Sequence, residues 1–293
     1  MGRLGNSWNV FKQSLTVIKQ DKELLILPVM AGIASFIMFL SFVFPAYTVG
    51  LLERAASGTD ENAEYTVYGL MLVLYLILSF ITIYFQSALM FGADQRLAGG
   101  DPTLGSALKG ANKRLGKIFV WSLFAATVSL LIQLIEAALR RAGNQIAASI
   151  IGAILGTAWT LLTFFVIPAV VFENKGPFEA LKRSGSLFKQ RWGESLVGHY
   201  GIGAIMGLFT FLSVLGIGFM VFLTASINAT VMIAVLVLGI LWLVFLTVLG
   251  TALSGVYKVA LYRFATKGEI APQFTPQSIQ GAYTPTHVSP NQL

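Results

Sequence analysis

The clearest candidates for binding chemistry in this 293-residue chain are two clusters of lysine and arginine. Each cluster occupies a short segment between long apolar stretches, among apolar residues at helical spacing. Cations in such a place bind anionic groups, either lipid headgroups or an acidic partner. In a second interpretation, the same cations only fix the orientation of the chain in a membrane. The candidate binding residues are Lys109, Lys113, Arg114 and Lys117 in the first cluster, and Lys182, Arg183, Lys189 and Arg191 in the second.

Three polar residues inside apolar stretches are candidates for lining a cavity: Gln86, Gln133 and His199. The alternative role for the two glutamines is a hydrogen bond between helices. His199 lies near the inner end of its stretch, where it either accepts a proton or caps the interface. Because the stretches carry no charged residue at membrane depth, a transporter coupled to protons or sodium is disfavoured.

The chain lacks the residues that several other kinds of chemistry need. It has no cysteine, which excludes disulfides, thiol catalysis and thiolate metal sites. Its second histidine, His287, lies in a polar tail far from His199, so we expect no metal site. The pair Gly99-Gly100 lacks the strand and helix context of a phosphate-binding loop. We therefore expect neither an enzyme nor a bound cofactor.

The elements that position these residues are predicted to be membrane-spanning helices. Only 11% of the residues are charged, whereas a soluble domain normally has roughly a quarter. The charge-free runs reach or exceed the ~18 residues that mark a spanning helix, and a polar break at 224–230 divides the longest run. The predicted spans are about 24–52, 65–93, 118–135, 145–172, 196–223 and 230–257.

The orientation follows from the positions of lysine and arginine, which resist translocation near the ends of spans. Of the 20 such residues, 17 fall before the first span, in alternate loops, or after the last span. The opposite side has only Arg54, Arg140 and Arg141. We therefore expect both termini to be cytoplasmic, in the inner (cytoplasmic) membrane. The basic residues line the membrane face, so nucleic acid is not an expected partner.

The segments that precede the first, third and fifth spans resemble one another. Each has an apolar stripe at helical spacing with lysines off the stripe, which predicts an amphipathic helix on the inner leaflet. These helices are expected at 1–23, at about 102–117 and at about 177–192, and the tail at 269–293 is expected to be disordered. The predicted fold is an all-α, polytopic membrane protein with three transmembrane hairpins, each preceded by an interfacial helix.

Several short motifs resemble those of a family of uncharacterised bacterial and archaeal six-span membrane proteins. The motifs are Ser7-Trp8, Asp21-Lys22-Glu23-Leu24 with Pro28, the run at 176–184, and Trp192-Gly193-Glu194. The resemblance covers about residues 1–268, and its plan is more distantly similar to the membrane domain of some glycerophosphodiester phosphodiesterases. It implies a six-helix membrane fold but no activity, because the family has no established catalytic residues and this chain has no room for the phosphodiesterase barrel.

The function that these observations favour is a non-enzymatic scaffold or accessory component of the membrane. Its basic helices would contact anionic headgroups or a membrane-protein partner, which includes a second copy of the chain. The alternative is a passive or lipid-handling transporter. A cavity open to Gln86, Gln133 or His199 would favour that alternative, whereas a paired acid and base in one cavity would favour an enzyme.

Overall fold

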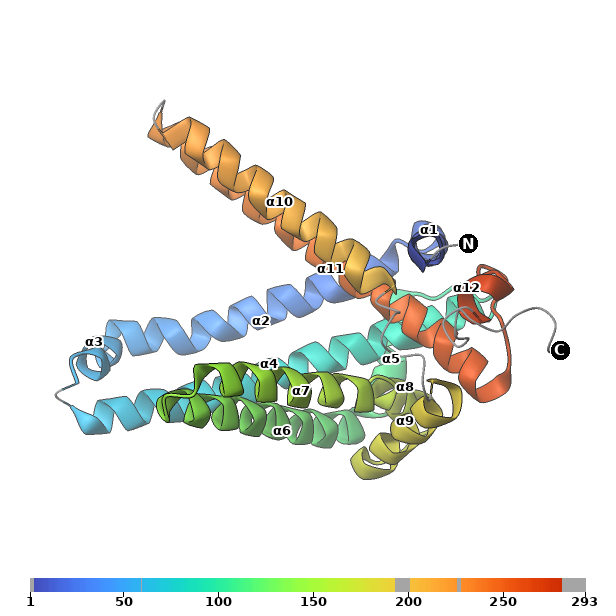
Figure 1. The fold of residues 1–293 in the computed structure, drawn as a ribbon, viewed down its shortest axis with the longest axis horizontal. Helices are drawn as coiled ribbons and strands as arrows, with labels where there is room; N and C mark the ends of the chain where they lie inside the picture. The colour runs from blue at the N-terminus through green and yellow to red at the C-terminus, as the bar shows by residue number, and fades with distance from the viewer. Residues whose placement is uncertain (1–2, 59, 193–200, 226–227, 281–293) are drawn as a thin grey trace. The chain divides into compact units, whose positions relative to one another are not determined.

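The computed structural model describes residues 3–58, 60–192, 201–225 and 228–280, and this part of the chain is helical without strands (Figure 1). Six of its helical segments are long and apolar enough to cross a membrane, which confirms the predicted multi-pass, all-α fold. They are α2 (Glu23–Thr48), α4 (Glu61–Leu97), α6 (Leu115–Arg141), α7 (Gln145–Leu162) together with α8 (Val166–Phe172), α10 (Gly201–Ala225) and α11 (Ala229–Lys267).

Shorter helices stand between and beside these spans. Three of them, α1 (Arg3–Gln20), α5 (Leu104–Asn112) and α9 (Pro177–Trp192), each precede a pair of spans in the sequence. The other two are α3 (Leu51–Ala56), between α2 and α4, and α12 (Pro276–Gln280), in the tail. Pro177 opens α9, where the missing N–H costs nothing, and Glu179 accepts a hydrogen bond from the Gly176 N–H at 3.3 Å.

The chain separates into two compact units, which are described one at a time. The first comprises residues 1–28, 92–104 and 189–293, and the second comprises residues 29–91 and 105–188. In the first unit, α10 and α11 lie side by side as a hairpin, and α1 packs on both (Figure 1). Helix α1 buries one face at Val10, Ser14 and Val17.

In the second unit, α6 and α7 form another hairpin (Figure 1). The rings of Trp121 and Trp159 stack across it with centroids 6.1 Å apart. Asn144 caps α7 by accepting from the Ala147 N–H at 3.1 Å. The backbone of α7 also comes close to α6 at Gly152, where an added Cβ would lie 2.7 Å from the Glu136 carboxylate.

The fourth span, expected as one helix over 145–172, is interrupted between α7 and α8. Pro168 cannot donate a hydrogen bond to the residue four positions before it, and its ring crowds that carbonyl. The Phe165 N–H instead donates at 3.0 Å to the hydroxyl of Ser184 on α9, which is fully buried. A side chain from another helix therefore satisfies the backbone at the break.

Several helix ends also differ from the expected positions. The second and sixth spans were expected to end at 93 and 257, where charged residues begin. The helices α4 and α11 continue through these charged residues to Leu97 and Lys267. The helix expected at 102–117 is divided into α5 and the start of α6, with Lys113 and Arg114 in the turn between them. The expected fifth span begins at 196, and its first residues lie outside the described part of the chain.

The described part of the tail differs from the expected disorder. Ala271, Phe274 and Ile279 are buried, and α12 packs on α1 and α11. Gln13 of α1 donates to the Thr275 hydroxyl at 3.2 Å. The disorder was expected from the polar composition of 269–293, in which these three apolar residues are widely spaced. They hold residues 271–279 against the bundle. Residues 281–293 lie outside the described part of the chain.

Candidate functional site

Two of the predicted cations, Arg114 and Lys117, bind the carboxyl end of α8. The Arg114 Nε donates to the Val171 carbonyl at 3.4 Å, and the Lys117 ammonium donates to the Asn174 carbonyl. Asn174 has a left-handed backbone with φ 54°, a conformation common just past a helix end. Cations stabilise the last carbonyls of a helix, so these two side chains have a structural task.

Arg183, a third predicted cation, is held by Glu173. Its Nε lies 3.0 Å from Oε1 of Glu173, whose Oε2 is 3.5 Å from the Lys175 ammonium. These groups are half-buried beside the same end of α8. Arg114, Lys117 and Arg183 thus belong to one cluster that fixes the turn between α8 and α9.

The remaining described lysines of the two clusters, Lys109, Lys113, Lys182 and Lys189, are exposed. Within the described residues, none of these four has a hydrogen bond or ion pair to another side chain. The structure therefore divides the candidate cations into those that hold the fold and those that remain available to an external anion. The side chain of Arg191 lies outside the described part of the chain.

The exposed lysines occupy the side of each helix opposite its buried side. On α9, Ala180, Ser184 and Leu187 are buried, while Lys182 and Lys189 are seven residues apart and project from the opposite side. On α5, Ala107 and Ala111 are buried, and Lys109 is exposed on the opposite side of the helix.

Helix α1 repeats the pattern of α9 position by position. Lys12 and Lys19 are exposed, and each follows a buried residue, Val10 or Val17, by two positions, as Lys182 and Lys189 follow Ala180 and Leu187. Ser14 and Ser184 are buried at equivalent places.

Both helices also expose an aromatic residue four positions before their first lysine. Trp8 is 41% exposed and Phe178 is 71% exposed. The Lys12 ammonium lies 5.6 Å from the centre of the Trp8 ring. α1 and α9 therefore each present a buried side, an exposed aromatic residue and exposed lysines.

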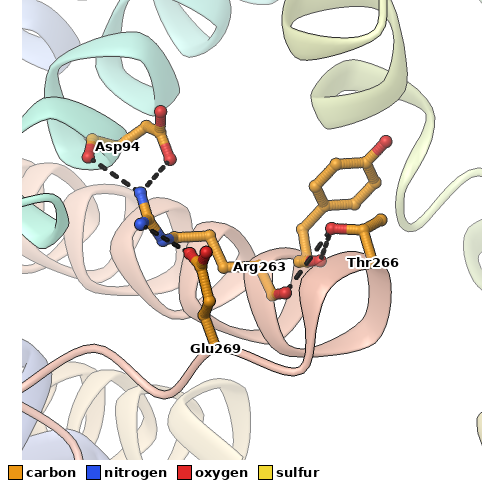
Figure 2. Close-up of polar contacts among 5 residues, drawn as sticks. Asp94, Arg263, Thr266 and Glu269 are labelled. Carbon is orange, nitrogen blue, oxygen red and sulfur yellow. Dashed lines mark hydrogen bonds and ion pairs between the residues drawn. The ribbon is translucent and has the colours of Figure 1, made fainter.

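A second group of charges, in the first unit, ties the ends of spans together. Figure 2 shows Arg263 of α11 between two acids: its Nη1 is 2.9 Å from Asp94 of α4, and its Nη2 is 2.9 Å from Glu269. Thr266, one turn along α11, donates to its own helix at the Tyr262 carbonyl, 2.7 Å away. The side chain of Arg263 is only 14% exposed.

Arg96 at the end of α4 has a similar arrangement. It pairs with Asp21, which is buried, and with Asp101 at 2.8 Å. Nearby in the chain, the Glu23 carboxylate accepts from the Leu104 N–H at the start of α5, 2.6 Å away. From the sequence, Arg96 and Arg263 were expected to mark topology and to belong to similar segments after the second and sixth spans, with no ion pair predicted for either. The signal that was available is the repeated basic residue after the second and sixth spans, Arg96 and Arg263.

A pocket of about 290 Å³ lies between α4 and α6 in the second unit. Gln86 is half-buried and Gln133 is exposed, and neither is among the residues that line the pocket. His199 lies outside the described residues. The lining residues are Tyr75, Leu78, Ser79, Thr82, Ile83, Ala125, Ala126 and Ser129.

A family model matches residues 63–272, which run from the start of α4 past the end of α11. The family is described as a family of unknown function, DUF6159. This confirms the expected resemblance to an uncharacterised family. No curated protein matches the chain.

Proposed function

This chain belongs to the DUF6159 family, and we propose that it is a non-enzymatic membrane protein whose short basic helices bind anionic lipid headgroups. The observation that supports the proposal is the shared pattern of α1 and α9. Each helix buries one side in the protein, exposes an aromatic residue, and exposes lysines that have no hydrogen bond or ion pair to another side chain among the described residues. The Lys12 ammonium of α1 also lies over the Trp8 ring.

The pattern suits a helix that lies at the surface of a bilayer. An exposed Trp8 or Phe178 would enter the interface, where aromatic rings are favoured. Lysine stems lie along apolar surface while their ammonium groups reach the headgroups. The positive-inside distribution of lysine and arginine supports a cytoplasmic position for these helices, with both termini on that side.

In this proposal the protein is a scaffold or accessory component, and the anionic leaflet is its main ligand. Arg114, Lys117 and Arg183 stabilise the α8–α9 turn and hold α9 in place, while the four exposed lysines contact lipid. A transporter is the weaker candidate, because the pocket between α4 and α6 is not lined by Gln86 or Gln133.

The proposal is tested by replacing Lys109, Lys113, Lys182 and Lys189 together with Gln. Each lysine near an anionic surface contributes about 1 kcal/mol, so binding should weaken by more than tenfold at low salt. Screening should shrink the difference between variant and wild type as salt is added. The measurement is the amount of phosphatidylserine or phosphatidylglycerol that stays with the full-length protein in mild detergent, across a salt series.

The matched control replaces the same four lysines with arginine, which keeps the charge and should retain lipid. Reporter fusions after Gly58 and Gly100 should give external and cytoplasmic signals in every variant, which separates lipid binding from orientation. Unchanged lipid retention in a correctly inserted Gln variant would leave these lysines as topology signals only. Loss of a co-purifying acidic protein, with lipid retained, would identify a protein partner instead.

A further inference from the structure

The pocket between α4 and α6 lies near the middle of both helices. Ser79 is the central residue of α4 (Glu61–Leu97), and Ser129 is one residue past the centre of α6 (Leu115–Arg141). With a rise of 1.5 Å per residue, Ser79 is roughly 27 Å from either end of its helix. The pocket is therefore at the depth of the hydrocarbon core.

Aromatic contacts separate the two helices around the pocket, and small side chains leave the space. The Tyr75 hydroxyl donates to the Ala126 carbonyl at 3.4 Å, and the rings of Phe80 and Phe119 meet edge to face at 5.5 Å. Ala125, Ala126 and Ser129 line the α6 side. The room that they leave would admit a ring-sized group.

The hydroxyls of Ser79 and Ser129, which line the pocket, differ from nearby hydroxyls in their hydrogen bonding. Thr82 on α4 and Thr127 on α6 donate to carbonyls of their own helices, at 2.9 Å and 2.8 Å. Ser79 and Ser129 line the pocket, and neither has a hydrogen bond to any residue in the described part of the chain. An unpaired hydroxyl in hydrocarbon costs free energy, so an occupant that accepts hydrogen bonds would be stabilised there.

We propose that this pocket binds the uncharged, carbonyl-bearing head group of a membrane-soluble lipid, of the chemical class of isoprenoid quinones. The lining contains no charged residue, and a charged headgroup at this depth would be strongly disfavoured. A saturated acyl chain would leave both serine hydroxyls unpaired. A neutral quinone ring offers two carbonyl acceptors to Ser79 and Ser129, and a flat face to Tyr75.

The size of the pocket agrees with this class of ligand. Pockets for whole drug-sized molecules hold about 300–1,000 Å³, and this one, at about 290 Å³, is at the lower limit. It therefore accommodates a head group, while the isoprenoid tail stays in the bilayer. The inference is separate from headgroup binding by α5 and α9, and it adds a second lipid ligand of different chemistry.

The test uses the full-length protein in nanodiscs with a photoreactive benzoquinone carrying a ten-carbon tail, and maps the labelled peptides. Labelling is expected on α4 and α6 around Ser79 and Ser129, and decyl-benzoquinone should compete with it. Ser79→Ala with Ser129→Ala removes both donors but keeps the space. Hydrogen bonds inside membranes contribute about 0.6 kcal/mol each, so half-labelling should require about eight times more probe.

Ser79→Leu with Ser129→Leu fills the pocket and should abolish the labelling. Thr127→Leu is the matched control, because Thr127 is exposed and is not among the lining residues. If the Leu pair does not insert, the Ala pair decides alone. Equal labelling by a decylbenzene probe that lacks carbonyls, or unchanged labelling in the Ala pair, would overturn the proposal. Labelling should persist when the four lysines are replaced with Gln, so the two lipid-binding proposals fail independently.

Discussion

The charged residues of this chain differ in what they contact, and the contact decides their role. Arg96 and Arg263 each join acids from different parts of the chain and are largely withdrawn from solvent. Arg114 and Arg183 hold one turn, at the end of α8. Exposed lysines such as Lys182 and Lys189 have no hydrogen bond or ion pair in the described part of the chain, and their ammonium ends are suited to phosphate groups. A count of positive charges cannot separate these roles, because all of them lie on the side expected to be cytoplasmic.

At the residue scale, we predict that Asp94→Ala destabilises the protein more than Glu136→Gln does. The first change removes one hydrogen-bonding partner of Arg263, whose side chain is 14% exposed and keeps Glu269, and should cost about 1–3 kcal/mol. Glu136 pairs with Arg140 at the surface, where such pairs contribute at most about 1 kcal/mol. Thermal unfolding in detergent, followed by circular dichroism, gives the order of the two variants. Equal melting temperatures would show that the Arg263 pair contributes no more than a surface pair.

At the scale of elements, the fold was largely predictable from the apolar runs, whereas the contacts at their ends were not. Each expected span corresponds to a helical segment in the described part of the chain, because about twenty consecutive apolar residues favour helix in a membrane. The break before Pro168 was missed because its stabilising partner, Ser184, lies 19 residues further along the chain. The Arg96–Asp21 and Arg263–Asp94 pairs span 75 and 169 residues, and no local pattern indicates such pairs.

The candidate lipid-binding residues were predictable only as a group. Helical periodicity predicted lysines off an apolar stripe, and the described lysines at these positions are exposed, but it did not identify the side that packs on the protein. The buried side of α9 consists of Ala180, Ser184 and Leu187, of which Ala and Ser give little hydropathy signal. The more apolar residues Trp8 and Phe178 are exposed. Small buried residues and exposed aromatics can be distinguished only when the neighbouring helices are known.

The prediction at this scale concerns the break between α7 and α8. Ser184→Ala removes the acceptor of the Phe165 N–H in a fully buried site and should destabilise the protein by about 1–3 kcal/mol. Ser186→Ala is the matched control, because the Ser186 hydroxyl donates to the Arg183 carbonyl of its own helix at 2.9 Å. It should change stability by less than about 0.5 kcal/mol. Equal unfolding free energies for the two variants would mean that the bond to Ser184 does not stabilise the break.

At the scale of the whole molecule, the chain repeats a plan of short basic helix followed by two spans. The plan begins at α1, at α5 and at α9, and Lys12, Lys109 and Lys182 each stand two positions after a buried residue. The family match at 63–272 contains the second and third repeats of this plan, which begin at α5 and α9. Repetition of the same exposed lysine position supports a common task for the three helices, which we propose is contact with the anionic leaflet.

The depth of α1 and α9 in a bilayer tests this account most directly. One variant keeps Trp8 and replaces the other four tryptophans with Phe. A second variant replaces all five tryptophans with Phe and carries Phe178→Trp, so that position 178 holds its one tryptophan. In vesicles containing anionic lipid, quenchers attached near the headgroup should reduce the fluorescence of both more than quenchers at the bilayer centre, because both side chains are exposed beside lysines. Circular dichroism checks that both variants remain helical. Stronger quenching from the bilayer centre, or none from either depth, would contradict the proposal that these helices lie on the membrane surface.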